Sequence, residues 1–232
     1  MIETPIEGTS SGLTLSASVA NTLRAQITSG TMPPGEKLHL DDLRAALGVS
    51  LSPLREALSR LSAEGFVVME SNRGYRVAPV SEGNLLEVTR LRTMLESFAL
   101  RESIRLGDER WEGAVVAGLY QLNKRVGAKD VKLGDWETTH RALHQQLLSA
   151  CGMPLVLHFC SILHDLNDRY RRLFLEDHPI DLSVADEHAD ICSAALDRDA
   201  DKACALLEAH IERTGANVAK TLRERSVSHD AA

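Results

Sequence analysis

The chain has 232 residues, which is enough for two modest domains with separate cores. Hydrophobic residues make up 44% and charged residues 25%, as in ordinary soluble globular proteins, and no apolar run approaches the ~18 residues that span a membrane. The formal charge is −7, of which residues 1–80 carry only −1. This balance argues mildly against nonspecific nucleic-acid binding, so any case for DNA must come from sequence pattern.

The start of the chain and its cysteines suggest the cellular compartment. The first residues, MIETPIEGTS, lack the basic and apolar regions of a secretory signal. The four cysteines form no CxxC pair, and we expect them to be free, buried thiols in a reducing cytosol: Cys151, Cys160, Cys192 and Cys204. The sequence therefore predicts a cytoplasmic protein without a membrane partner.

Residues 13–80, after a flexible leader at 1–12, have the pattern of a small mixed domain. Apolar residues recur every four positions over 15–29 and predict a helix, and GTMPPG at 30–35 predicts a turn. A second helix is expected at 39–47 and ends at Gly48. A third follows from Ser50, its expected N-cap, to about residue 63. Strands at 66–69 and 75–78 flank a turn at 71–74. Helix, helix, tight turn, helix and β-hairpin is the order of a winged helix-turn-helix.

Residues 81–225 are predicted to be all helical. Helices are expected near 81–106, 108–126, 132–150, 154–176, 181–197 and 199–224, where glycines and prolines separate them. The first should bury a near-heptad apolar stripe, namely Leu85, Val88, Leu91, Leu95 and Phe98. Residues 226–232 are expected to be a frayed tail. The fold class is therefore mainly α, with an N-terminal winged helix-turn-helix and a C-terminal antiparallel helical bundle.

Five residues of the first domain are candidates for DNA contact. Arg55, on the third helix, is long enough to reach a guanine edge or a phosphate, and its alternative is a surface ion pair with Glu56 or a neighbour. The hydroxyl of Ser52 either donates a hydrogen bond to a DNA phosphate or only caps the helix. Arg73 and Gly74 at the hairpin tip fit a wing contact or only a tight turn. Arg44 is a weaker candidate for a phosphate contact.

Four histidines lie at inward positions of the predicted bundle. His140 and His144 are four residues apart on one helical face, while His188 and His210 fall within apolar stripes of two later helices. One core histidine is usually a structural residue, but each of four would need its own hydrogen-bond partners. A shared divalent metal satisfies all four, and nitrogen-rich coordination suits zinc, nickel, cobalt or copper, of which zinc is expected first and nickel next. The other five show no such pattern and are interpreted as ordinary residues: His39, His158, His164, His178 and His229.

Several motifs with fixed spacing resemble a known family. PGEKL at 34–38, LGVSLSPLREAL at 47–58, EGFV at 64–67 and NRGYRV at 72–77 resemble the DNA-binding head of GntR regulators. The second half resembles the all-helical, FCD-type effector domain of the FadR-like branch, through RxxLE at 92–96, LH at 143–144, GMP at 152–154, EH at 187–188 and His210. Within that branch, PLREALS, GYRVA and Asp135-Trp136 look closest to regulators of the carbon-starvation and glutarate-catabolism type (CsiR/GlaR).

The resemblance implies roles for particular residues. In the metal-binding domains of this branch an Asp and three His hold the ion, and His140, His144, His188 and His210 occupy those positions, with His140 where Asp is usual. Replacing Asp by His removes a negative charge and a hard oxygen, which favours softer ions. Arg92 matches a family arginine that faces the ligand pocket, and its alternative is a structural pair with Glu96. Arg169 is a second candidate for the ligand.

These observations predict a homodimeric repressor that binds a palindromic operator in double-stranded DNA. A small carboxylate, with a dicarboxylate such as glutarate suggested by resemblance, would bind at the metal site and modulate DNA binding. The alternative is a metal sensor in which the ion itself is the effector. An enzyme is not expected, because HRALH at 140–144 lacks the general base of HExxH and the winged head would have no role.

Overall fold

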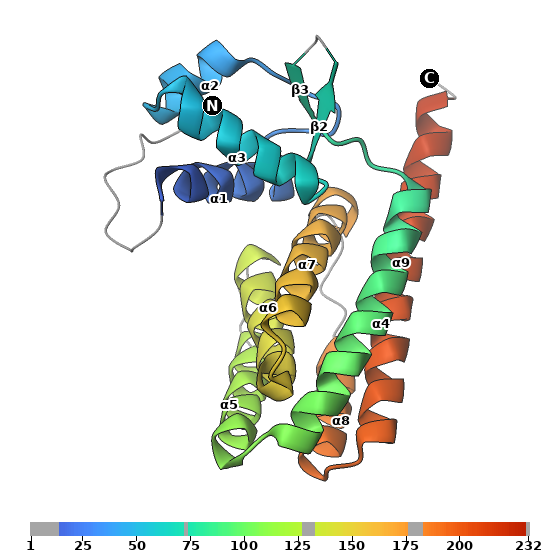
Figure 1. The fold of residues 1–232 in the computed structure, drawn as a ribbon. Helices are drawn as coiled ribbons and strands as arrows, with labels where there is room; N and C mark the ends of the chain where they lie inside the picture. The colour runs from blue at the N-terminus through green and yellow to red at the C-terminus, as the bar shows by residue number, and fades with distance from the viewer. Residues whose placement is uncertain (1–13, 72–73, 127–132, 176–182, 231–232) are drawn as a thin grey trace. The chain divides into compact units, whose positions relative to one another are not determined.

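The computed structural model describes residues 14–71, 74–126, 133–175 and 183–230. The chain divides into two compact units, Met1–Ser81 and Glu82–Ala232. The elements of both units are labelled in Figure 1. The fold class is the predicted one, mainly helical with a small antiparallel sheet in the first unit.

The first unit packs three helices against a three-stranded sheet. The helices are α1 (Leu15–Thr28), α2 (Leu40–Leu47) and α3 (Leu51–Ala63), and the strands are β1 (Lys37–Leu38), β2 (Val67–Glu70) and β3 (Gly74–Val77). β3 lies between β1 and β2, with Lys37 opposite Arg76 and Glu70 opposite Gly74. The two-residue strand β1 was not predicted, because Lys37 and Leu38 are too few to show alternation.

Local sequence accounts for the ends of these elements. Gly48 adopts φ +65° after α2, a left-handed conformation that favours glycine and closes the helix as expected. Ser50 occupies the N-cap position of α3 with extended backbone, although its side chain makes no cap hydrogen bond. The predicted stripe of α3 is buried, as expected, and joins residues of α1 in the core: Val19, Leu23, Leu54, Ala57, Leu58 and Leu61.

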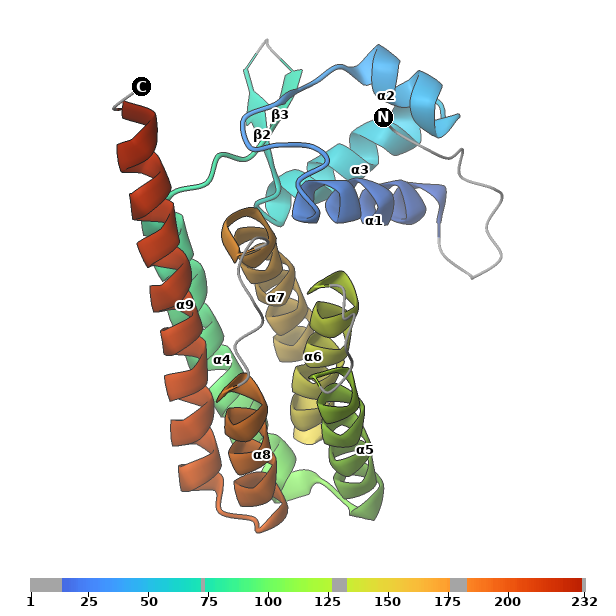
Figure 2. The same cartoon turned by 180° about the vertical axis from the view of Figure 1, so that it is seen from behind.

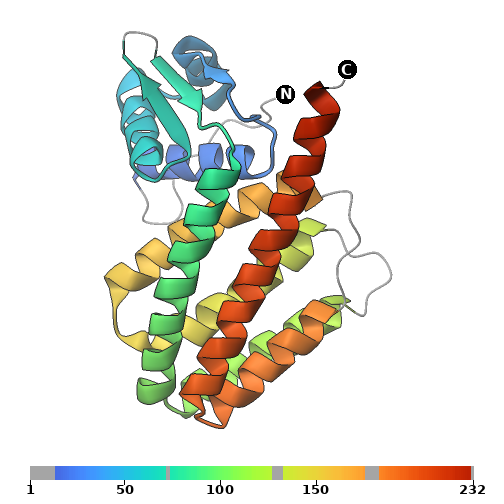
Figure 3. The same cartoon turned by 90° about the vertical axis from the view of Figure 1, so that its right-hand side faces the viewer.

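The second unit is a bundle of six helices in the described chain. They are α4 (Glu82–Leu106), α5 (Glu109–Val126), α6 (Leu133–Leu148), α7 (Pro154–Leu175), α8 (Ser183–Leu196) and α9 (Ala200–Asp230), with a short 3₁₀ turn at Ser149–Cys151. α4 and α9 lie side by side and antiparallel in Figure 3, and α8 lies along α9 in Figure 2. α9 continues to Asp230, so its backbone is helical through most of the segment that was expected to be a tail. None of the helices in the described ranges is long and apolar enough to cross a membrane.

The first helix of the bundle buries a different stripe from the expected one. Leu85 and Val88 are buried, but Leu91 and Phe98 are exposed. Arg92 and Glu96 are buried in their place, and their guanidinium and carboxylate neutralise each other across one helical turn. The apolar pattern misplaced part of the buried face because a charged residue can occupy a buried position when it is paired.

Candidate metal centre and nucleic-acid interface

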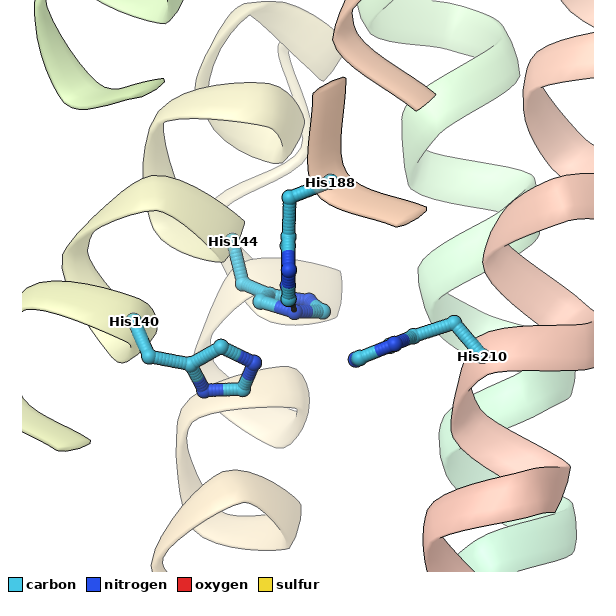
Figure 4. A group of neighbouring side chains, drawn as sticks. All are labelled: His140, His144, His188 and His210. Atoms are coloured by element: carbon cyan, nitrogen blue, oxygen red, sulfur yellow. Dashed lines mark hydrogen bonds between the residues drawn. The ribbon is translucent and has the colours of Figure 1, made fainter. Parts of the chain in front are cut away.

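Four histidine side chains from three helices meet in the interior of the bundle. His140 and His144 project from successive turns of α6, His188 comes from α8 and His210 from α9, and Figure 4 shows the rings turned toward one another. All four are buried. Each offers a ring nitrogen within 4.8 Å of the others'. The Nε2 atoms of His144 and His188 are 3.2 Å apart, close to the roughly 3.3 Å between two ligands of a tetrahedral zinc ion.

In three of these rings, the Nδ1 atom that faces away from the histidine group donates a hydrogen bond to an oxygen atom. Nδ1 of His144 donates to Oε2 of Glu96 at 3.2 Å. Nδ1 of His188 donates to the carbonyl oxygen of Val184 at 2.5 Å, and Nδ1 of His210 donates to Oε2 of Glu187 at 2.8 Å. A metal-binding histidine usually donates its other N–H in this way, which leaves the Nε2 lone pair directed at the ion. The environment of His144, His188 and His210 therefore fits metal ligation through Nε2.

His140 has a different environment. Its Nδ1 lies 3.4 Å from Nη1 of Arg171, which donates hydrogen bonds and cannot accept one. Its Nε2 is buried and has no hydrogen-bond partner among the described residues. The ring stacks on Trp136, with the ring centres 4.7 Å apart. Because Nδ1 accepts from Arg171, the proton of the neutral His140 ring lies on Nε2, and this unpartnered N–H is available to an anionic ligand; Nε2 can bind an ion only once the ring gives up its contact with Arg171.

Burial keeps the four histidines neutral. It lowers the pKa of His144 and of His210 to about 4, even though Glu96 and Glu187 oppose the shift. Burial, followed by the charges of neighbouring histidines, also holds the pKa of His140 and of His188 well below the ordinary value. Neutral imidazole is the form that binds a metal.

Glu96 connects the histidine group to an arginine. Its buried carboxylate lies 2.7 Å from Nε of Arg92, and its Oε2 is 3.2 Å from both His144 and His164. Burial raises the pKa of Glu96, but Arg92, then His164 and hydrogen bonds, hold it well below the ordinary value. Arg92, predicted as a ligand-binding residue with this pair as its alternative, is thus engaged with Glu96. His164, interpreted from sequence as ordinary, lies in the second group of possible metal ligands with Glu96 and His144.

One signal in the sequence would have indicated His164. Cys160, His164, Asn167 and Arg171 are buried at spacings of four, three and four residues along α7. The same stripe leads to Arg171, whose guanidinium contacts His140 and lies over the Trp136 ring at 4.9 Å. Arg169, the predicted ligand residue of this segment, is also buried on α7. The four cysteines are free and buried, as expected.

In the first unit, the recognition-helix candidates lie on an exposed surface. Ser52 and Arg55 are exposed on α3, three residues apart. Glu56 accepts a hydrogen bond from Ser16 at 2.9 Å instead of pairing with Arg55, and Arg55 forms no ion pair with any described residue. Arg44 pairs with Asp41 at 3.1 Å on the surface. Gly74 is exposed with φ +89° at the start of β3, while Arg73 lies outside the described residues.

Two family descriptions match the two units in turn. The gntR family of bacterial regulatory proteins matches residues 15–77, and the FCD domain matches residues 87–213. The chain is 37% identical over 194 residues to the uncharacterized HTH-type transcriptional regulator BphR of Paraburkholderia xenovorans strain LB400, covering 82% of this chain and 79% of that protein. It is 32% identical over 195 residues to the HTH-type transcriptional repressor GlaR of Escherichia coli strain K12, covering 82% and 89%.

Solved structures share the same fold. McbR/YncC of E. coli superposes with a TM-score of 0.77 over 90% of this chain and 99% of that chain, at 20% identity. The curated relatives are transcription regulators, which confirms the expectation that the chain is not an enzyme. The chain belongs to the GntR family of DNA-binding transcription regulators, and an FCD domain follows its helix-turn-helix domain in the sequence.

Proposed function

We propose that this regulator is a cytoplasmic, homodimeric repressor that is released from a palindromic operator by a small carboxylate bound at a metal ion. The observation that carries the proposal is the convergence of His140, His144, His188 and His210 in the interior of the FCD domain. Release requires that the carboxylate bind more tightly to the conformation that does not bind DNA.

The donor set supports a divalent metal with a preference for nitrogen. Four neutral imidazoles suit zinc first and nickel as the alternative, whereas calcium and magnesium need oxygen ligands. The hydrogen bonds behind His144, His188 and His210 direct three Nε2 atoms inward. These three would hold the ion, and His140 would complete the set or leave a position for a ligand.

The charge around the group supports an anionic effector. The imidazoles bring no negative charge to a divalent ion, and the nearest carboxylates already have arginine partners. Glu96 pairs with Arg92, and Glu187 pairs with Arg213 at 2.7 Å. A carboxylate entering an open position on the ion would supply the missing negative charge.

An exposed apolar face supports a second copy of the chain as partner. Leu91, Met94 and Phe98 form a stripe on the solvent side of α4, and Leu155 and Phe159 on α7 are exposed one turn apart. α4 and α7 pack against each other. Exposed apolar residues gathered in this way are typical of protein interfaces, and a two-fold dimer covers the same face of both subunits.

The closed arrangement of the four histidines favours one second candidate. A tetrahedral ion held by all four would have no open position, as in structural or purely metal-sensing sites. The ion itself would then be the effector. The two candidates differ in whether a carboxylate has any effect once the metal is bound.

Elemental analysis of the full-length protein, with thermal melts and operator binding, tests the proposal. We expect about one zinc or nickel per chain, lost in His144→Ala and retained in the exposed-histidine control His158→Ala. A small carboxylate should then raise the melting temperature and weaken operator binding only when metal is present. Weakened operator binding with metal alone, unchanged by any carboxylate, would establish the metal sensor. Absence of metal after reconstitution would refute both.

Replacing Arg55 by alanine should weaken operator binding roughly 5- to 100-fold, because an exposed arginine on the recognition helix is free to contact a base or phosphate. A DNA fragment selected from a random library by the wild-type protein serves as the probe. Arg60→Ala is the control, since Arg60 is exposed in the last turn of the same helix. Equal losses in the two variants would contradict a specific role for Arg55.

A further inference from the structure

We propose that Arg171, flanked by His140 and Trp136, binds a second carboxylate of the effector, so that the site selects dicarboxylates over monocarboxylates. This inference rests on the proposed function, because it assigns the first carboxylate to the metal. It also shifts the ligand-binding role from Arg92 and Arg169 to a neighbouring residue.

The argument begins with a buried charge that lacks an ion pair. Arg171 is 8% exposed, and its guanidinium forms no ion pair with any residue in the described part of the chain. Buried arginines are normally paired, because an isolated buried charge is strongly unfavourable. The buried Arg92 follows that rule by pairing with Glu96, and the partly exposed Arg172 and Arg141 also have carboxylate partners, Glu137 and Asp165.

The carboxylates that influence Arg171 are each engaged elsewhere. Burial lowers the pKa of Arg171, while Asp168 and Glu137 oppose the shift from a distance. Asp168 lies 3.6 Å from Arg141, and Glu137 lies 2.7 Å from Arg172. The three arginines and three carboxylates of this region balance in formal charge, but Arg141 takes two of the carboxylates and Arg172 the third, so that none lies within ion-pair distance of Arg171 among the described residues.

Unpartnered donors accompany this charge. Nε of Arg171 and Nε1 of Trp136 are both buried without a hydrogen-bond partner in the ranges that the structure describes. Nε2 of His140 shares that condition, and its ring stacks on the Trp136 ring. Unsatisfied buried donors are rare in proteins, and several together around a cation are typical of an anion site whose ligand completes them. The planar fork of a guanidinium matches a carboxylate in particular.

The position of Arg171 relative to the four histidines indicates that one effector would need two carboxylates to reach both the arginine and the metal. Of the four histidines, the guanidinium contacts His140 alone among the described residues, and it approaches that ring at Nδ1. The remaining three direct their Nε2 atoms to the point where the ion would lie. An anion at Arg171 therefore lies at the His140 edge of the group, separate from a carboxylate on the metal, and a dicarboxylate joins the two positions.

The test compares matched acids on matched variants. Succinate, glutarate and adipate are each paired with the monocarboxylate of equal length, namely butyrate, pentanoate and hexanoate, and affinities for the metal-loaded protein are measured by calorimetry. The wild type should prefer at least one dicarboxylate by roughly 10- to 100-fold, the range expected for a charge-assisted bidentate contact. Arg171→Gln should remove that preference and leave monocarboxylate affinity and metal content unchanged.

A second measurement separates binding from folding. Because Arg171→Gln removes an unpaired buried charge, the variant without effector should melt at or above the wild-type temperature. Arg172→Gln, which breaks the pair with Glu137, is the control and should keep the dicarboxylate preference. If monocarboxylates and dicarboxylates bind the wild type equally, the inference is wrong and the carboxylate sensor stands. If neither class binds the metal-loaded protein, the effector proposal fails together with the inference.

Discussion

Glu96→Gln is expected to destabilise the metal-free protein by about 3–5 kcal/mol, the usual cost of breaking a buried ion pair on one side. Glu96 is fully buried and is the carboxylate that faces Arg92, His144 and His164. A glutamine amide fills the same volume but leaves the guanidinium of Arg92 as an uncompensated buried charge. Chemical denaturation of the chelator-treated protein measures the loss.

The same variant should also bind metal more weakly, by roughly 10- to 100-fold, because Glu96 orients His144 through Nδ1. Glu102→Gln is the matched control on α4, since Glu102 forms a surface pair with Arg105 whose loss should change stability little. The double variant Arg92→Met with Glu96→Gln should recover part of the lost stability, because it also removes the uncompensated charge of Arg92. No recovery in the double variant would show that the uncompensated charge of Arg92 is not the cause of the loss.

The sequence predicted most of the fold because its signals are local. Periodicity, glycine at Gly48 and the proline-rich turn at 30–35 give the three helices and hairpin of the head. The six helices of the bundle lie within a few residues of the expected ranges, except that α9 continues into the expected tail. The histidine group also followed from local spacing, because two rings four residues apart share a face and two more lie in apolar stripes. The strand β1 was missed because its pairing with β3 is a contact between distant segments.

The partners of the histidines could not be predicted, since they depend on how helices pack. The Arg92–Glu96 pair was recognised as an alternative from its spacing, but its burial and its contact with His144 and His164 join three helices. Arg171 is a similar case. In sequence it is one of several arginines near Asp168, and only the packing of α7 against α6 brings it to His140. A charged residue is expected at the surface until its partner is known.

The metal-free protein is expected to lose stability steeply as the pH falls from about 6.5 to about 4. A histidine whose pKa is lower in the folded state than in the unfolded state opposes folding wherever the unfolded chain takes up the proton. For His144 and His210, with pKa values of about 4 against 6.5, the loss is about 3 kcal/mol each once the pH reaches 4. His140, His164 and His188 shift in the same direction. Well above pH 6.5, from about pH 7.5, almost no histidine is protonated in either state and the effect vanishes.

Two buried carboxylates among the described residues, Glu137 and Asp168, oppose this trend because burial raises their pKa values, but they do not reverse it. Burial raises the pKa of Glu137 to about 7, so its protonation stabilises the folded state between pH 7 and 4.5 by about 3 kcal/mol, which offsets one histidine.

The free energy of unfolding, measured with denaturant at pH 8.0, 6.5, 5.5 and 4.5, should therefore still fall. His210→Gln should make the fall smaller by about 3 kcal/mol, whereas the exposed-histidine variant His158→Ala should leave it unchanged. Because protons compete with metal for the same lone pairs, the loaded protein should release its ion over the same pH range. A free energy of unfolding that stays constant from pH 7 to 4.5 would show that the histidine group is solvated, and that it is not the buried, neutral ligand set on which the metal proposal depends.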